Sequence, residues 1–198
     1  MSNEQDLIRV DVLELIQTDS IANLVKATKD GNLALGIVNG NLYVKDFNGL
    51  VFPAIRSEPI AAGATLAMTE EKHSGKTILF DTAAGSICTL PPSTGKGAIY
   101  RFAIKTKATT NSHIVKVENA DDSFVGGVQT VSDDAGAAVK GYFAASGDDT
   151  LTLNRTTTGS VSNGEFVEVQ DIEEGKYLVR GFTSSSGTEA TPFSATVS

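Results

Sequence analysis

The 198-residue sequence contains a single cysteine, Cys88, and no tryptophan. One cysteine cannot form a disulfide within the chain, so oxidative cross-links do not hold this fold. No apolar run approaches the ~20 residues of a membrane-spanning helix. The N-terminus has no basic start followed by an apolar run, as a secretory signal would have. We therefore expect a protein that is made in a cytoplasm and has no membrane partner.

Positive charge is also scarce, since 24 acidic residues outnumber 16 lysines and arginines and the formal net charge is −8. Binding to the phosphates of nucleic acid requires a basic face. Docking on an anionic membrane requires one as well. The charge balance therefore argues against nucleic acid and against membranes as partners.

Residues suited to catalysis are few and isolated. His73 and His113 are the only histidines, and neither has a neighbour at metal-ligand spacing. Cys88 lies in an expected strand, where a buried small hydrophobe is the better interpretation. Residues 74–77, Ser-Gly-Lys-Thr, end like a phosphate-binding loop, but Glu70 occupies the position of its first glycine and a strand follows. We predict no enzyme, no cofactor and no metal site.

Two further groups of residues admit a functional and a structural interpretation. The acidic pairs are read as turns, with calcium binding as the alternative, and they are Asp121-Asp122, Asp133-Asp134 and Asp148-Asp149. The strand aromatics are predicted to be core rather than a sugar-stacking platform, and they are Tyr100, Phe102, Tyr142, Phe143, Phe166 and Tyr177.

The stretch 76–105 has the clearest strand pattern, with short apolar runs at 77–81, 86–90 and 99–105 separated by Gly and Pro. We predict that these runs form a three-stranded meander. Further strands are expected at residues 113–118, 123–131, 138–144, 150–153, 165–170 and 176–182. The spacing predicts an all-β fold, an antiparallel β-sandwich or barrel. The tail, residues 183–198, is expected either to fray or to be ordered by an intersubunit contact.

Asp-Gly or Asn-Gly recurs every nine residues, at Asp30-Gly31, Asn39-Gly40 and Asn48-Gly49, with apolar runs between. These dipeptides favour tight hairpin turns, so the segment predicts a small β-meander. We expect an N-terminal region, residues 1–62, and a β-sandwich or barrel domain, residues 63–198. Strands this short are marginal alone, so the meander is expected to pack against another subunit or the second domain.

Residues 1–27 contain neither Gly nor Pro. We expect them to form an N-terminal arm or a short helix. The choice stays open, because the apolar positions fit both helical and strand spacing. The segment either packs on its own domain or docks on a partner chain. In the second case the interface residues are Leu7, Ile8, Val10, Val12, Leu13, Leu15 and Ile16.

Six short phrases from residue 76 onward belong together, and they are LFDTAAG at 79–85, TLPPSTGKG at 89–97, IYRF at 99–102, NSHIVKV at 111–117, DDTLTLN at 148–154 and GTEATPFS at 187–194. In combination they resemble a β-rich module of virion structural proteins of tailed bacteriophages, especially capsid-decorating and head-fibre proteins. The resemblance covers the last two-thirds of the chain, and residues 1–65 lie outside it.

This resemblance implies a non-enzymatic structural protein, made in the host cytoplasm and located on the capsid surface of the virion. Such proteins bind the major capsid protein, often as homotrimers, and stabilise the head. A receptor- or glycan-binding fibre or spike module of the virion is the first alternative. A tail-spike esterase or glycosidase is the second.

Overall fold

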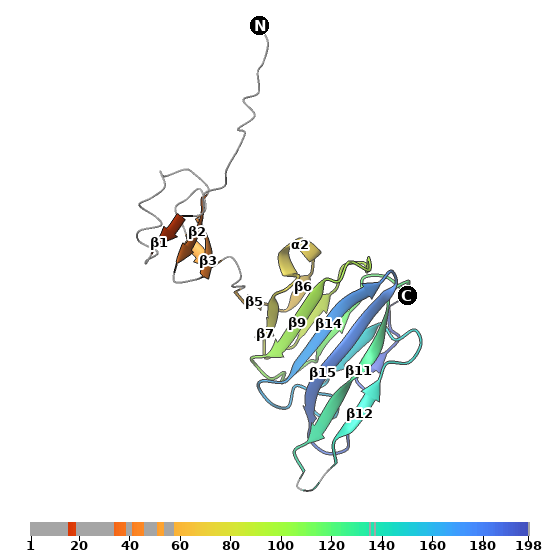
Figure 1. Cartoon of the computed structure of the whole chain (residues 1–198). Helices are drawn as coiled ribbons and strands as arrows, with labels where there is room; N and C mark the ends of the chain where they lie inside the picture. The colour runs from red at the N-terminus through yellow and green to blue at the C-terminus, as the bar shows by residue number, and fades with distance from the viewer. Residues whose placement is uncertain are drawn as a thin grey trace. The chain divides into compact units, whose positions relative to one another are not determined.

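The computed structural model describes residues 16–18, 34–38, 41–45, 51–53, 58–134, 136 and 138–197. Contacts divide the chain into two units, Met1–Arg56 and Ser57–Ser198 (Figure 1). The expected division after residue 62 lies further along the chain. Residues 57–62 belong to the second unit, because β5 (Ile60–Ala61) pairs with a strand of that unit.

The first unit contains a four-stranded sheet in the order β1-β2-β3-β4. β2 and β3 are antiparallel with Val38 opposite Asn41, the register of a two-residue hairpin connection, and β4 pairs antiparallel with β3. The predicted small meander is therefore confirmed, and β1 extends it parallel to β2. The strands are β1 (Ile16–Thr18), β2 (Ala34–Val38), β3 (Asn41–Lys45) and β4 (Val51–Pro53).

The second unit consists of two sheets, a seven-stranded one in the order β12-β11-β15-β14-β9-β7-β5 and a five-stranded one in the order β16-β13-β10-β8-β6 (Figure 1). Their strands, after β5, are β6 (Thr65–Ala67), β7 (Thr77–Phe80), β8 (Ser86–Thr89), β9 (Ile99–Ile104), β10 (His113–Lys116), β11 (Ser123–Ser132), β12 (Lys140–Phe143), β13 (Thr150–Leu153), β14 (Phe166–Glu173), β15 (Lys176–Ser185) and β16 (Phe193–Ser194). A short helix, α2 (Glu70–His73), lies between β6 and β7.

The predicted all-β sandwich is confirmed, but its sheets are mixed rather than antiparallel. From β5 to β10 each strand lies in the opposite sheet from the one before it, so that β5, β7 and β9 are parallel neighbours, as are β6, β8 and β10. Over the described residues neither sheet closes into a barrel.

The meander predicted for residues 76–105 is wrong in its pairing, although all three strands exist. β7 and β9 pair directly with each other, and β8 lies in the other sheet. Packed sheets are separated by ~10 Å, which the connections before and after β8 are long enough to cross. The apolar alternation is the same in either arrangement, since every strand still has one face toward the core.

The C-terminal tail does not fray, because contacts within its own unit hold residues 193–197. β16 pairs with β13, and Phe193 is buried in the core. The buried Asp149 carboxylate accepts hydrogen bonds from the backbone N–H of Thr196 (2.8 Å) and of Val197 (3.1 Å). These bonds fix the chain just beyond the last strand.

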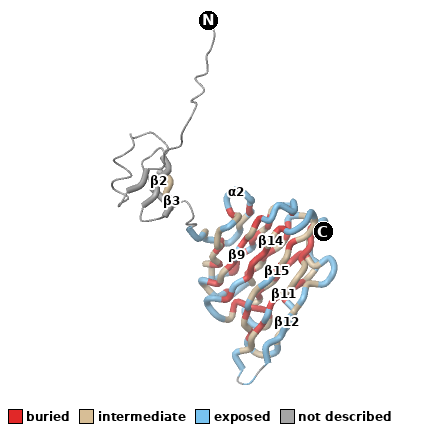
Figure 2. The backbone as a smooth tube through the Cα atoms, viewed as in Figure 1, coloured by how far each residue is buried: buried red, intermediate tan, exposed pale blue. Residues whose placement is uncertain are grey.

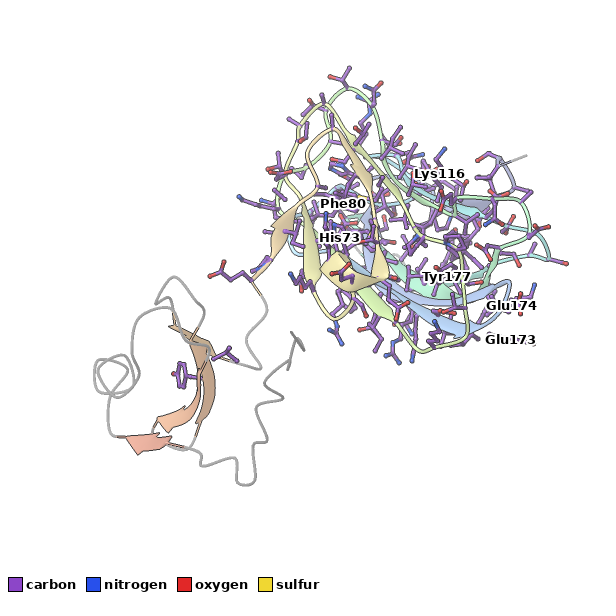
Figure 3. All side chains as sticks on the ribbon, turned by 90° about the horizontal axis from the view of Figure 1, so that it is seen from above. His73, Phe80, Lys116, Glu173, Glu174 and Tyr177 are labelled. Carbon is purple, nitrogen blue, oxygen red and sulfur yellow. The ribbon has the colours of Figure 1, made fainter. Side chains whose placement is uncertain are left out.

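The core lies between the two sheets, where buried residues alternate with exposed ones along the strands (Figure 2). Phe80 stacks on Phe102 with ring centroids 5.6 Å apart. The Tyr177 hydroxyl donates to the Pro91 carbonyl oxygen at 2.6 Å, which satisfies its polar group inside the core. In Figure 3, Phe80 and Tyr177 lie among the interior side chains, whereas Glu173 and Glu174 lie at the outside of the β14–β15 hairpin.

Gly126 in β11 gives a test of this packing. Its φ is +90°, and a Cβ there would lie 2.4 Å from the Val179 carbonyl oxygen of β15. We expect Gly126→Ala to lower the free energy of unfolding by about 3 kcal/mol, measured by urea denaturation followed by circular dichroism. Gly141→Ala is the matched control, because its Cβ meets nothing within 4 Å. Equal stability of the two variants would contradict the β11–β15 packing.

Candidate binding surface

The interface predicted in the N-terminal arm is only partly covered by the described residues. Ile16 lies in β1. The other six residues lie outside the described part of the chain, and they are Leu7, Ile8, Val10, Val12, Leu13 and Leu15. Their role in docking stays a prediction.

Cys88 is buried on β8 with no exposed surface, as expected. Burial raises the pKa of its thiol to about 12. The thiolate is the nucleophilic form, so Cys88 is unreactive at neutral pH and serves as a core residue.

His113 is likewise a core residue. Its ring stacks on Phe80 with centroids 4.5 Å apart, and Nε2 lies 3.0 Å from the Thr106 carbonyl oxygen. A carbonyl only accepts, so Nε2 carries the proton and Nδ1 is the bare nitrogen. Nδ1 is buried and has no hydrogen-bond partner among the described residues. Burial lowers the pKa of His113, which keeps the ring neutral.

The remaining candidates from the sequence have structural contacts too. His73 is buried in α2, and its Nδ1 accepts a hydrogen bond from the Thr69 N–H at 2.9 Å. Buried Asp122 accepts from the Ser93 hydroxyl at 2.7 Å, which pins the loop after β8. Among the described residues no three His, Cys, Asp or Glu side chains are grouped to hold a metal ion.

The seven-stranded sheet has an outer face that carries three exposed phenylalanines. Phe166 of β14 lies directly opposite Phe182 of β15, and they are 50% and 41% exposed. Phe143 on the edge strand β12 is 79% exposed. The prediction of a core position is therefore wrong for Phe143 and Phe166, whereas Tyr100, Phe102 and Tyr177 are buried and Tyr142 packs against the core.

The sequence contained a signal for these exposed rings. Residues that alternate along a strand point to opposite faces. Phe166 has the same parity as Glu168, and the opposite parity from the buried Val167 and Val169. Phe182 likewise has the parity of Arg180. The charged residue in each strand identifies the outer face, and the aromatic residue two positions away lies on it.

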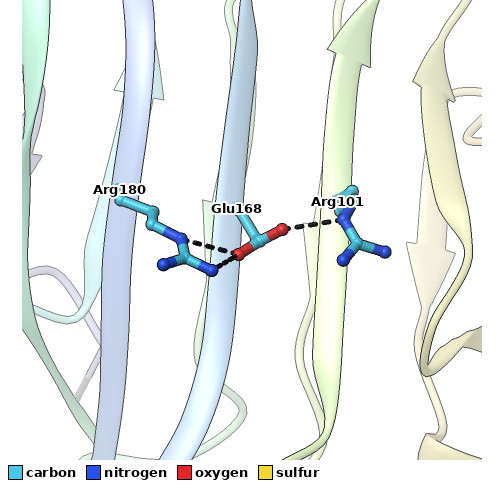
Figure 4. A network of polar contacts seen from close by, with 3 residues as sticks. All are labelled: Arg101, Glu168 and Arg180. Atoms are coloured by element: carbon cyan, nitrogen blue, oxygen red, sulfur yellow. Dashed lines mark hydrogen bonds and ion pairs between the residues drawn. The ribbon is translucent and has the colours of Figure 1, made fainter.

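An ion cluster crosses three strands at the centre of this face (Figure 4). Glu168 on β14 lies opposite Arg101 on β9 and Arg180 on β15. The Nε atoms of Arg101 and of Arg180 each donate to a different carboxylate oxygen of Glu168, both at 2.7 Å, and Arg180 Nη2 makes a further contact. The cluster links the side chains of three neighbouring strands, and it leaves one net positive charge on the surface of an acidic protein.

Partial burial raises the pKa of Glu168, but hydrogen bonds from Arg180 and then Arg101 lower it by more, so its pKa lies below the usual value. The carboxylate is therefore charged throughout the neutral range. Exposed arginines contribute little stability through each ion pair. The cluster chiefly orients the three side chains. Phe166 and Phe182 lie two residues away from it on β14 and β15, and Phe143 lies on the edge strand β12.

A pocket of about 310 Å³ opens beside Phe182 at one end of this face. Its floor is the buried carboxylate of Glu165 (2% exposed), which accepts hydrogen bonds from three consecutive backbone N–H groups, those of Ser160, Val161 and Ser162, at 2.6–2.8 Å. The hydroxyl of Ser184 donates to the same carboxylate at 2.6 Å. Sequence reasoning missed this site because a glutamate is expected at the surface, whereas Glu165 is buried and meets Ser184 at the open end of the β14–β15 hairpin.

Comparison with known proteins finds no match among protein-family models or among curated proteins. Within the described residues, no helix is long and apolar enough to span a membrane.

The ion cluster predicts a titration shift. We expect Arg180→Gln to raise the pKa of Glu168 toward its usual value, because one of two cationic hydrogen-bond donors is lost, as followed by carboxyl carbon NMR. Lys105→Gln removes the same charge without touching Glu168 and is the matched control. An unchanged titration of Glu168 in Arg180→Gln would contradict the geometry of Figure 4.

His113 predicts a pH dependence of stability. Its pKa is lowered in the folded state from an ordinary 6.5, so the unfolded chain binds the proton more readily. Protonation of His113 in the unfolded chain therefore lowers the free energy of unfolding as the pH falls below 6.5, and it has no effect above that pH. The slope is at most about 1.4 kcal/mol per pH unit. We expect the free energy of unfolding of His113→Gln to fall less than that of wild type when the pH is lowered from 7 to 5. Parallel curves for the two proteins would contradict a buried neutral His113.

Proposed function

We propose that this protein is a non-enzymatic structural protein of a tailed-bacteriophage virion, which binds the outer capsid surface and stabilises the head. Its partners in this proposal are the major capsid protein and further copies of itself, assembled as a homotrimer. The N-terminal unit attaches to the capsid, and the two-sheet unit is displayed from it.

The observation that carries the proposal is the division of the chain into two unequal units. The first unit contributes a four-stranded sheet whose strands have three to five residues. Sheets this small are marginal unless a hydrophobic face packs on something else. Symmetric assembly or a capsid surface would supply that packing. The sequence resemblance, which begins at residue 76, lies within the second unit and implies the same class of protein.

The second unit supports the proposal because its potentially reactive side chains serve the fold. The thiol of Cys88 and the rings of His73 and His113 are enclosed in the fold. The buried acidic side chains Asp122, Asp149 and Asp171 are occupied by hydrogen bonds that anchor loops. A rigid scaffold of this kind suits a structural role on a shell.

The direct test mixes the purified protein with undecorated capsids and, separately, with host cells. We expect stoichiometric binding to capsids and a higher temperature of capsid disruption, because bound copies tie neighbouring capsid subunits together. Stoichiometric binding to host cells with none to capsids would exclude the decoration function.

The attachment element is tested by deleting residues 1–27. We expect the deletion to weaken capsid binding at least about tenfold, measured by co-sedimentation, and to reduce the trimer mass in light scattering. Phe143→Ala is the control, since it changes an exposed ring of the second unit and is expected to bind like wild type. Unchanged trimer mass and capsid binding after the deletion would show that residues 1–27 are not the attachment element.

A further inference from the structure

We propose that the pocket beside Phe182 binds a saccharide, with one neutral pyranose ring of an oligosaccharide stacked on the Phe182 side chain. This site is separate from the N-terminal unit and goes beyond the proposed structural function. The pocket has an aromatic wall, a polar rim, a fixed floor and an acidic lining.

The aromatic wall is Phe182, which is 41% exposed and lies opposite Phe166 in the β14–β15 ladder. Directly opposite residues on one face of a sheet are close neighbours, so Phe166 flanks Phe182 on the outer face. A phenyl ring offers a flat apolar surface with a negative face. The C–H groups on one side of a pyranose are weakly positive and stack on such a face.

The polar rim consists of the Asp133 carboxylate and the Asn163 amide, both exposed at the mouth of the pocket. Neither side chain makes a hydrogen bond to another described residue. Asp133 can accept from two neighbouring sugar hydroxyls, and Asn163 can both donate and accept. This combination matches vicinal hydroxyl groups, which present donors and acceptors side by side.

The floor and walls are fixed before any ligand arrives. Glu165 holds the Ser160–Ser162 loop by its backbone and Ser184 by its hydroxyl. On the other side, the Asp133 backbone N–H donates to the Ser185 carbonyl oxygen at 2.9 Å. A preformed pocket avoids much of the entropy cost of ordering loops on binding.

Volume and charge define the class of ligand. A pocket of about 310 Å³ is at the small end of ligand sites, so it accommodates one sugar ring rather than a larger ligand. Its described lining includes the carboxylates of Asp133 and Glu165 and no lysine or arginine. Anionic sugars are therefore disfavoured, and neutral pyranoses are expected.

The same face is less suited to a protein partner. Stable protein interfaces bury ~800 Å² on each partner around an apolar centre that is depleted in charge. Here the Arg101–Glu168–Arg180 cluster occupies the centre of the sheet, and Phe166 and Phe182 lie two residues away from it on β14 and β15. The aromatic surface is concentrated beside the pocket instead.

The test titrates the full-length protein with maltotetraose, cellotetraose, mannotetraose and chitotetraose, and with tetragalacturonate as the anionic comparison. We expect at least one neutral tetrasaccharide to bind with a millimolar or tighter dissociation constant in calorimetry. Backbone NMR signals of Asn163, Gly164 and Ser184 should shift on binding, a measurement that needs no variant. We expect Phe182→Ala and Asn163→Ala each to weaken binding at least about tenfold.

Phe143→Ala is the matched control, because it removes another exposed phenyl ring of the same face that does not line the pocket. Asn163→Ala guards against misfolding of Phe182→Ala, since Asn163 makes no hydrogen bond within the described fold. The proposal is overturned if no neutral tetrasaccharide binds at millimolar concentration, or if only tetragalacturonate binds. It is equally overturned if Phe143→Ala alone reduces binding, or if Phe182→Ala abolishes capsid binding while wild type binds no sugar.

Discussion

Buried carboxylates that accept hydrogen bonds from loop N–H groups hold the connections between the two sheets. Asp171 accepts from the backbone of Thr94 (2.9 Å) and Gly95 (2.7 Å), and Asp149 holds the C-terminal segment in the same way. Glu165 collects three consecutive N–H groups. An unpartnered buried charge would be strongly unfavourable, so each loop has one position in which its anchor is satisfied.

These anchors are needed because the topology makes long connections. From β5 to β10 the chain crosses between sheets at every step, which excludes the two-residue turns that join antiparallel neighbours. Loops that cross the edge of a sandwich leave backbone groups without ladder partners. The Asp and Glu side chains satisfy those groups, and at Glu165 the same bonding shapes the pocket beside Phe182. Scaffold and candidate binding site thus depend on one kind of interaction.

Much of the fold was predictable from residue pattern. The strands at 77–81, 99–105 and 150–153 were expected within a residue or two of β7, β9 and β13, because apolar alternation is a local property. The Asn-Gly repeat predicted the hairpin between β2 and β3 for the same reason. The pairing of strands was not predictable, since parallel neighbours such as β7 and β9 are brought together by a strand of the other sheet.

The sequence by itself determined that the chain folds as β-sheets with one apolar face per strand, and that Cys88 and Tyr100 would be enclosed. The alternation also distinguished a core face from an outer face along the strands of the second unit. Only the tertiary structure decided which strand joined which sheet, and that Phe143, Phe166 and Phe182 share one outer face. Phe166 is exposed because Val167 and Val169 occupy the core side of β14, and its neighbour Phe182 comes from β15, the other strand of the same hairpin. Alternation is local, whereas pairing between strands is not.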